Sequence, residues 1–331
     1  MDLQTGDEGR ESQERRKRVV GMKLNGKSQF MKKKYHLSFT LFILLTIVSN
    51  RGLAGVVCAG DTILQGIDVS VYQGTINWTD VKNAGIVFAY ARVNDGSFLD
   101  TTFSSNWAGM KTAGIIRGAY SYFEPAQDPT TQANDFLNAL GTLQPGDLPP
   151  MLDLEITGGE SAGTIITNVN TWMRIVQAAT GRIPIIYTAP GFWNASVGST
   201  NFSLYPLWAV NWSVTCPTLA EGWTSWVIWQ YSDSGTVSGI SGSVDLDEFN
   251  GSMSDILIFG NKQSLNIAPE NGRQLSITWS TFAVGFGLQQ CSNLETTNWV
   301  NVTNTPVVLT SQEQVTLSTS TNATFFRLFH P

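Results

Sequence analysis

The sequence predicts an α/β fold, a TIM-like barrel over residues 60–260, followed by a small all-β domain. Three observations predict it. Short apolar runs alternate with helix-like segments from about residue 66, the helices disappear in the second half of this region, and only β-like runs remain after residue 272. Apolar runs separated by turn residues are typical of parallel strands buried on both faces. Roughly 200 residues suffice for one such core.

Eight apolar runs are the candidate strands of the barrel. Helix-like segments separate the first five, whereas the later connections are rich in Gly, Ser, Thr, Asn and Trp and are predicted to be loops or short turns. The strands are Gly66–Ser70, Ile86–Arg92, Ile115–Phe123, Pro149–Glu155, Ile183–Thr188, Leu207–Val210, Trp226–Tyr231 and Ser243–Glu248. The helices are Trp78–Ala84, Thr101–Ala113, Thr130–Leu140 and Ala162–Thr180. The barrel therefore has a complete helical half and a helix-poor half.

Residues 273–331 form the predicted all-β domain. Residues 261–272 are mostly polar, with Pro269 and Gly272 as breakers, and are predicted to be a linker. Beyond them, short β-like runs alternate with Thr, Asn and Ser, which favours a small sandwich-like domain. The runs are Leu275–Trp279, Phe286–Gln290, Trp299–Val302, Pro306–Leu309, Gln314–Leu317 and Thr324–Leu328.

The first 59 residues are predicted to be an N-terminal extension with a signal peptide at about 31–59. Three lysines follow Met31, residues 37–48 carry no charge, and small residues come next, which is the pattern of a secretory signal. The apolar run of about a dozen residues is short for a membrane span, which needs roughly twenty. We therefore expect cleavage after Ala54 or Ala59, a secreted protein, extracellular or periplasmic, and no membrane attachment afterwards.

The composition excludes most catalytic chemistries. There are two histidines, His36 and His330, and neither lies in the predicted barrel, so it cannot hold a Ser-His-Asp triad, a Cys-His pair or a histidine zinc site. Of the three cysteines, Cys216 and Cys291 could pair in an oxidising compartment, but they lie in different predicted domains, and two isolated buried thiols are favoured. We expect no metal and no cofactor.

The exported chain is strongly acidic. Removing residues 1–59 takes away 11 of the 20 Lys and Arg and 5 of the 26 Asp and Glu, which leaves a net charge of about −12. Such a surface repels phosphate backbones, so nucleic-acid binding is not expected. Attachment to anionic walls or membranes by charge alone is disfavoured for the same reason. Substrate must therefore be held by specific contacts.

The stretch from Met151 to Glu155 sets two carboxylates at the exit of an apolar strand. Side chains of an extended strand alternate between faces, so Asp153 and Glu155 point one way while Leu152 and Leu154 point the other. The two acidic Cα atoms lie about 6.6 Å apart, at roughly 3.3 Å per residue. Two acids this close repel when both are ionised, which raises one pKa and leaves a proton donor beside a carboxylate. That pairing suits glycoside cleavage.

Two further acids lie at strand ends. Residues at the C-terminal ends of barrel strands converge on one face, where active sites are built. Asp68 ends the first strand, Asp245 is on the eighth, and these strands are neighbours when the barrel closes. We therefore expect both to lie beside Asp153 and Glu155. Asp247 faces the same way one step beyond Asp245, and we interpret it as a surface or capping residue.

With these acids in place, the sequence resembles glycoside hydrolase family 25, the Chalaropsis-type lysozymes, over about residues 66–250. The resemblance implies a (β/α)5β3 barrel and hydrolysis of the β-1,4 bond between N-acetylmuramic acid and N-acetylglucosamine in peptidoglycan glycan strands. The motifs that carry it, in the family's order and spacing, are Gly66-Ile67-Asp68-Val69-Ser70, Tyr72-Gln73-Gly74, Asp100, Phe103, Ala113-Gly114, Gly118-Ala119-Tyr120, Asp153-Leu154-Glu155, Pro184-Ile185-Ile186-Tyr187-Thr188, Trp208, Trp229-Gln230-Tyr231-Ser232 and Val244-Asp245-Leu246-Asp247.

The resemblance also implies roles for residues. Glu155 is the general acid/base and Asp153 its partner. Asp153 either orients and charge-stabilises the substrate's acetamido group as an internal nucleophile, with retention, or assists a water or sugar directly; we favour the first. Asp68 and Asp245 are expected to hold sugar hydroxyls and to tune the pKa of Glu155. A substrate role and a helix cap are equally favoured for Asp100. The residues expected to contact the sugar are Tyr120, Tyr122, Tyr187 and Trp229.

Two other functions stay open. A chitinase-like glycosidase also uses a strand-borne Asp-x-Glu, but it expects a further aspartate where Met151 stands. A non-catalytic carbohydrate-binding barrel would use the acids only to hold sugar. The C-terminal domain is predicted either to tether the protein to glycan or to another protein, or to act as a spacer.

Overall fold

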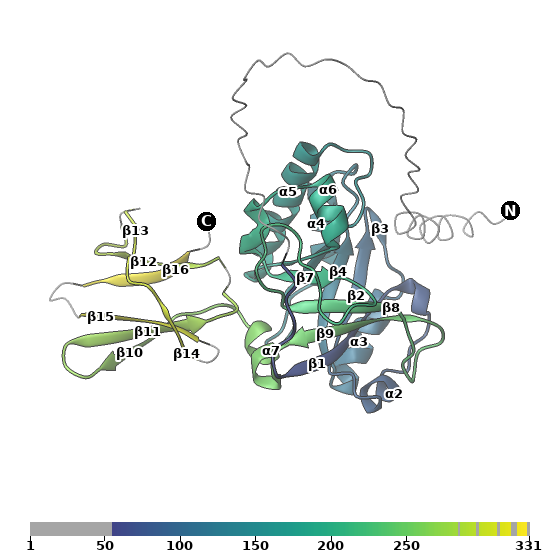
Figure 1. Ribbon diagram of the computed structural model, residues 1–331, viewed down its shortest axis with the longest axis horizontal. Helices are drawn as coiled ribbons and strands as arrows, with labels where there is room; N and C mark the ends of the chain where they lie inside the picture. The colour runs from purple at the N-terminus through teal and green to yellow at the C-terminus, as the bar shows by residue number, and fades with distance from the viewer. Residues whose placement is uncertain (1–54, 284, 296–297, 310–311, 319–322, 330–331) are drawn as a thin grey trace, which may run out of the picture. The chain divides into compact units, whose positions relative to one another are not determined.

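The computed structural model describes residues 55–283, 285–295, 298–309, 312–318 and 323–329 (Figure 1). The predicted N-terminal extension and most of the predicted signal peptide lie outside these ranges. Within them, no helix is both long enough and apolar enough to cross a membrane.

Eight strands close into a barrel, and every one of them was predicted from the sequence. They are β1 (Ile63–Val69), β2 (Phe88–Asp95), β4 (Ile116–Tyr122), β5 (Met151–Asp153), β6 (Ile185–Thr188), β7 (Leu207–Val210), β8 (Ile228–Gly235) and β9 (Val244–Asn250). The barrel closes because β1 pairs with both β2 and β9. A short strand, β3 (Phe98–Leu99), is added beside β2.

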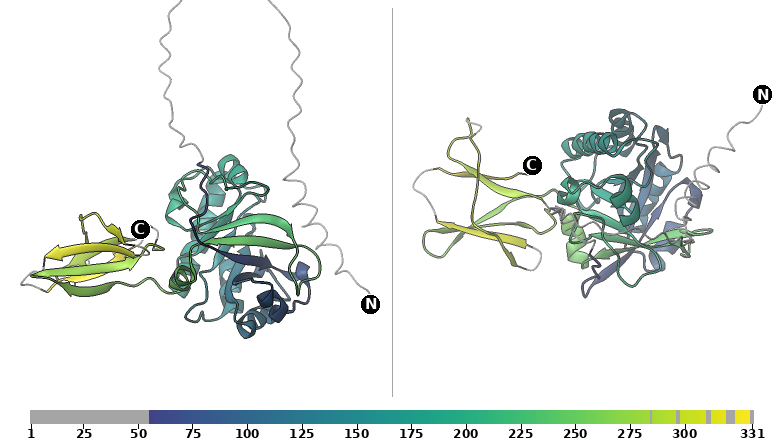
Figure 2. Two further views of the ribbon diagram at one scale, coloured as in Figure 1. Left: turned by 60° about the horizontal axis from the view of Figure 1, so that its bottom comes forward. Right: turned by 45° about the horizontal axis from the view of Figure 1, so that its top comes forward.

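Helices surround the barrel wall (Figures 1 and 2). The four predicted helical segments are confirmed as α2 (Trp78–Asn83), α3 (Phe103–Ala113), α4 (Pro129–Leu140) and α5 (Ala162–Thr180). Side-chain oxygens of Asn77, Asp128 and Ser161 accept hydrogen bonds from the first turns of α2, α4 and α5, and so satisfy N–H groups that the helix leaves unpaired. Gly181 ends α5 in the left-handed conformation that favours glycine.

Two helices lie where none was predicted, α6 (Pro190–Ser196) and α7 (Met253–Phe259), together with the 3-10 turns η1 (Val71–Gln73) and η2 (Asn201–Leu204). The segment after the fifth strand was predicted to be loops or short turns because it is rich in Gly, Ser, Thr, Asn and Trp. Proline is well tolerated at the first helical position, where its missing N–H has no partner to lose. Pro190 therefore starts α6 instead of preventing it.

Residues alternate between the two faces of the barrel wall. Tyr90, Tyr120, Met151, Tyr187 and Trp208 belong to a cluster inside the barrel. A separate cluster joins the outer face of the wall to the helices, and among its members are Ile67, Leu152, Leu154, Ile186, Phe136 and Trp172. Since Met151 is inside and Leu152 is outside, the period of two puts the next residue, Asp153, on the inner face.

Strand β9 differs from the expectation of an all-parallel barrel. Neighbouring strands run parallel from β1 round to β8, but β9 is antiparallel to both β8 and β1. Asp245 therefore lies near the beginning of β9, and its register partner on β1 is Asp68. The reversed direction still brings Asp245 to the end of the barrel where β1 finishes. The short connection between β8 and β9, residues 236–243, is the signal for this, because parallel neighbours need a crossover of about a dozen residues or more.

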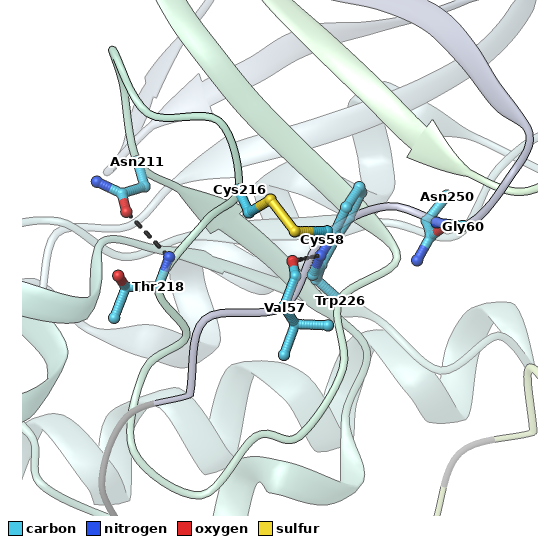
Figure 3. The surroundings of a disulfide bond; sticks show 8 residues. All are labelled: Val57, Cys58, Gly60, Asn211, Cys216, Thr218, Trp226 and Asn250. Atoms are coloured by element: carbon cyan, nitrogen blue, oxygen red, sulfur yellow. Dashed lines mark hydrogen bonds between the residues drawn. A yellow bond between two sulfur atoms is a disulfide. The ribbon is translucent and has the colours of Figure 1, made fainter.

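The disulfide pattern overturns the sequence prediction. Cys58 is bonded to Cys216 (Figure 3), and Cys291 is a free, buried thiol. The prediction that Cys216 and Cys291 are two isolated thiols is therefore wrong for Cys216. The true partner was discounted because Cys58 falls inside the predicted signal peptide.

The C-terminal residues form two antiparallel sheets. One has the order β10 (Asn266–Glu270), β11 (Gln274–Ser280), β15 (Gln312–Ser318) and β14 (Val307–Leu309), and the other has β13 (Val300–Asn301), β12 (Gly287–Cys291) and β16 (Phe325–Phe329). Ile277 and Val315 of the first sheet and Leu288 of the second share a small hydrophobic cluster. The six predicted strands are confirmed. The predicted linker is wrong at its end, since β10 pairs with β11 there, and Pro269 fits because β10 is an edge strand.

Candidate active site

The four predicted acids lie on the inner face of the barrel wall, at one end of it. Asp68 is near the end of β1, its register partner Asp245 is near the start of β9, and Asp153 is the last residue of β5. Glu155 follows two residues later. Asp68 and Asp153 are buried, 6% and 4% exposed, whereas Asp245 and Glu155 are half-buried. Asp68 and Asp153 are thus less exposed than Asp245 and Glu155.

Tyr187 on β6 lies next to the acids, since its register partner on β5 is Asp153. Burial raises the pKa of this tyrosine well above its usual value, and the charges of Glu155, Asp153, Asp68 and Asp245 raise the pKa further, in that order. Charges act strongly over only a few ångströms in a protein. All four carboxylates therefore lie close to the Tyr187 ring, whose hydroxyl stays protonated and can donate a hydrogen bond.

The exit of β5 is held in place although the strand ends at Asp153. The N–H of Leu154 donates to the carbonyl oxygen of Tyr187 at 3.0 Å, and the hydroxyl of Thr188 donates to the carbonyl oxygen of Leu154 at 2.9 Å. These two bonds fix the backbone immediately before Glu155. Its side chain consequently starts from a rigid strand end and not from a loose loop.

Gln230 joins the acids to their neighbours, and the sequence analysis missed it as a site residue. Its amide nitrogen donates to Asp68 Oδ2 at 2.7 Å, and its amide oxygen accepts from the Tyr187 hydroxyl and the Trp212 indole N–H, both at 3.0 Å. Both ends of the amide are therefore fixed. The available signal was a single amide in an otherwise apolar strand, because a buried polar group needs a partner.

Trp229, the neighbour that was predicted to contact sugar, lies elsewhere. It belongs to the cluster on the outer face of the wall, where its ring packs against Trp226 and Tyr231 at centroid distances of 6.0 and 5.8 Å. Its indole N–H donates to the carbonyl oxygen of Asn211 at 2.9 Å. The alternation along β8 thus gives the inner face to Gln230 and removes Trp229 from the group around the acids.

Asp247 is not the surface or capping residue that the sequence analysis expected. It is fully buried, and the Trp208 indole N–H donates to its Oδ1 at 3.2 Å. Burial raises the pKa of Asp247 well above its usual value, the nearby charges of Asp68 and Asp245 raise it further, and the bond from Trp208 opposes them. The surroundings of Asp247 therefore favour its protonated form.

Asp100 is fully occupied by protein donors. Its Oδ2 accepts from the Val71 N–H at 2.9 Å and from Arg92 Nε at 3.0 Å, and its Oδ1 accepts from the N–H and the hydroxyl of Thr102. Of its two predicted roles, the geometry favours holding the chain ahead of α3 over binding substrate. Through Val71 it also fixes the turn that follows Asp68.

Tyr120 and Tyr122 line the same inner face from β4. Their register partners on β5 are Met151 and Asp153, so Tyr122 is directly beside the deeper acid of the pair. Both tyrosines are buried. The arrangement provides carboxyl groups at two depths and neutral phenol donors around them, a combination that can protonate a leaving oxygen and hold sugar hydroxyls.

Comparison with known proteins agrees with this geometry. The sequence model of Glycosyl hydrolases family 25 matches residues 67–240. Lysozyme M1 of Streptomyces globisporus is 40% identical over 210 residues, which are 60% of this chain and 71% of that protein. The N,O-diacetylmuramidase of a Chalaropsis species is 33% identical over 202 residues, 55% and 96% of the two chains. The crystal structure of the lysozyme from Streptomyces coelicolor superposes with a TM-score of 0.58 at 38% identity, covering 61% of this chain and 99% of that one.

Proposed function

Because the chain belongs to family 25 of the glycosyl hydrolases, we propose that it is a peptidoglycan-hydrolysing muramidase. It cleaves the β-1,4 bond between N-acetylmuramic acid and N-acetylglucosamine. The observation that carries this proposal is the placement of the acids on neighbouring strands: Asp68 and Asp245 are register partners on β1 and β9, and Asp153, two residues before Glu155, is the register partner of Tyr187. The five strand–helix pairs followed by three strands also support the (β/α)5β3 arrangement of the barrel.

Glu155 is the proton donor. It is the half-buried member of the strand-borne pair, so it can reach a glycosidic oxygen that enters from solvent. As the bond breaks, Glu155 protonates the leaving oxygen, and the carbonyl oxygen of the substrate's acetamido group bonds to the anomeric carbon. Asp153, buried beside it, orients the acetamido N–H and stabilises the positive charge that develops there. Glu155 then takes a proton from the water that completes hydrolysis with retention.

The remaining groups hold the sugar. Asp68 is fixed by Gln230 and is positioned to accept from a hydroxyl, and Asp245 faces it across the β1–β9 pair. Tyr120, Tyr122 and Tyr187 provide donors and ring edges on the inner face.

The two competing functions predict different results. A chitinase-like site needs an acid in place of Met151, whose side chain lies in the apolar interior of the barrel. A sugar-binding barrel would bind glycan without cutting it.

Mass analysis of fragments released from purified cell walls tests the proposal. We expect loss of turbidity and new reducing ends on N-acetylmuramic acid. Glu155→Gln should lower the rate about 10²- to 10⁴-fold, the usual contribution of a general acid. Glu160→Gln, on the loop beyond, should keep full activity. Reducing ends on N-acetylglucosamine, or an active Glu155→Gln protein, would refute the assignment.

Two further parts of the proposal concern location. Export follows from the predicted signal, and the C-terminal sheets act as a tether to glycan. In that domain Arg327 stacks over Trp299 at 4.3 Å and donates to Gln289, which places an aromatic ring among polar groups. Retention of the full chain on insoluble peptidoglycan should fall in Trp299→Ala at unchanged rate on soluble fragments. Equal retention of both proteins would leave the domain as a spacer.

A further inference from the structure

The segment just after residue 54 is an integral part of the barrel domain. Val56 forms an antiparallel bridge with Thr218. The Val57 N–H donates to the carbonyl oxygen of Pro217 at 3.1 Å, and the Leu219 N–H donates to that of Gly55 at 2.9 Å. The segment is therefore held as a short extra strand along the loop that follows β7.

Side chains fix the same segment (Figure 3). The Trp226 indole N–H donates to the carbonyl oxygen of Val57 at 2.7 Å, and the Gly60 N–H donates to Asn250 Oδ1 at 2.9 Å. Trp226 is 2% exposed, so its ring is part of the core on which the segment lies. The disulfide between Cys58 and Cys216 joins the two sides covalently.

We propose that the exported chain is cut between Ala54 and Gly55, and that the new N-terminal segment is then fastened to the barrel by the Cys58–Cys216 disulfide. This rests on the export that the proposed function includes. The cut hydrolyses one peptide bond with one water, leaving a carboxylate on Ala54 and an ammonium group on Gly55. The disulfide forms when the two thiols give two electrons and two protons to a disulfide of an oxidising partner protein, which becomes a dithiol.

The alternative cut after Ala59 conflicts with the fold. It would remove Cys58 and leave Cys216 as an unpaired thiol. It would also remove the acceptor of the Trp226 indole N–H. A cut after Ala54 keeps every one of these contacts. Gly55 is exposed, so its new charge stays in water.

The residues around Ala54 suit the cut as well. Signal cleavage requires small residues at the last position and the third-last position of the leader. Before the first site these are Ala54 and Gly52, and before the second they are Ala59 and the larger Val57. The Cys58 sulfur is bonded to Cys216, which also removes it as a point of lipid attachment.

The loop that the disulfide joins to the N-terminal segment leads to the residues around the four acids. Asn211 Oδ1 accepts from the Thr218 N–H at 3.0 Å, so the strand that pairs with Val56 is tied to the start of the loop. The next residue, Trp212, donates to Gln230. The N-terminal segment thus stabilises a loop that supports the site.

The full-length gene, expressed in a bacterium with an oxidising periplasm, tests the proposal by N-terminal sequencing and intact mass. We expect a chain that starts at Gly55 and is two hydrogens lighter than its reduced form, with Cys291 as the cysteine that is alkylated after unfolding without reductant. Ala54→Leu should abolish this cut, and the matched Ala59→Leu should leave it in place. A start at Gly60 or later, or free thiols at both Cys58 and Cys216, would overturn the proposal.

A second measurement separates the inference from the function. Chains that start at Gly55 and at Gly60, exported behind the same foreign leader, should differ in Tm by roughly 10–20 °C, from the loop entropy that the disulfide removes. Equal Tm values would show that residues 55–59 and their disulfide do not stabilise the barrel domain. Cell-wall hydrolysis by the Gly55 chain is measured on the same sample, so a failure of the muramidase proposal is recognised independently of the cleavage site.

Discussion

Replacing Gln230 with methionine tests whether the amide network supports catalysis. Gln230→Met keeps the length and burial of the side chain but removes its three hydrogen bonds. The bond to the carboxylate of Asp68 is the strongest, since a hydrogen bond to a charged group contributes about 1.5–3 kcal/mol. At about 1.4 kcal/mol per tenfold in rate, loss of this contribution in the transition state lowers kcat/KM roughly 10- to 150-fold.

The same change affects stability by a separate route. The Tyr187 hydroxyl is buried and loses its acceptor, which costs about 1–3 kcal/mol. Trp212 is half-buried and can turn its indole N–H to water. The Tm should fall by roughly 2–12 °C for a domain of this size.

Rates on cell walls and thermal unfolding, measured on the same preparations, provide the assay. Trp212→Phe is the matched control because it removes one donor to the amide oxygen and leaves the contact of Gln230 with Asp68 intact. We expect a much smaller loss of kcat/KM in this control. If Gln230→Met keeps at least half of the normal rate, or if both variants lose activity equally, the network does not position Asp68 for catalysis.

Three further predictions concern the acids and the disulfide. The raised pKa of Asp247 means that the folded state binds the proton more tightly than the unfolded state. Protonation of Asp247 therefore stabilises the folded state. This contribution is complete below about pH 4 and is lost as the pH rises towards the pKa of Asp247 in the folded state. The difference in Tm between Asp247→Asn and the unchanged protein should therefore rise between about pH 4 and pH 7. Asp233→Asn, at an exposed position, is the matched control. A flat difference for Asp247→Asn would contradict the raised pKa of Asp247. Cys58→Ser removes the disulfide that joins residues at a sequence separation of 158, and it should lower the free energy of unfolding by about 5 kcal/mol in the chain-entropy model. Cys291→Ser is the control and should change the free energy of unfolding little. Equal losses in both variants would show that the disulfide does not stabilise the fold. If the acetamido group of the substrate is the nucleophile, azide should not restore activity to Asp153→Asn, and formation of a glycosyl azide would instead assign a direct role to Asp153.

Most of the barrel could be predicted because its strands are short apolar runs. Each run is buried on both faces, so its composition differs sharply from that of the connections. The positions of Asp153 and Glu155 followed from the period of two along β5, which is a local property. Their partners Asp68 and Asp245 followed from barrel closure.

What the sequence did not show depends on contacts between distant segments. Asp245 and Asp247 share a face of β9, and which of them is buried depends on the depth of Trp208 and its neighbours inside the barrel. Trp229 was predicted to contact sugar because its aromatic ring can stack on one, but its ring packs in the hydrophobic cluster on the outer face of the barrel wall. The pairing of Cys58 depends on a loop that comes 158 residues later.

The pairing of β1 with β9 divides the acid group between the two ends of the barrel sequence. Asp68 is contributed by the first strand, and Asp245 by the last. A chain that is still being synthesised, or one that has lost its final strand to a protease, holds Asp68, Asp153 and Glu155 but lacks Asp245 and the strand that pairs with β1. Under the proposed function, the substrate site is therefore complete only once the last strand of the barrel has paired with the first.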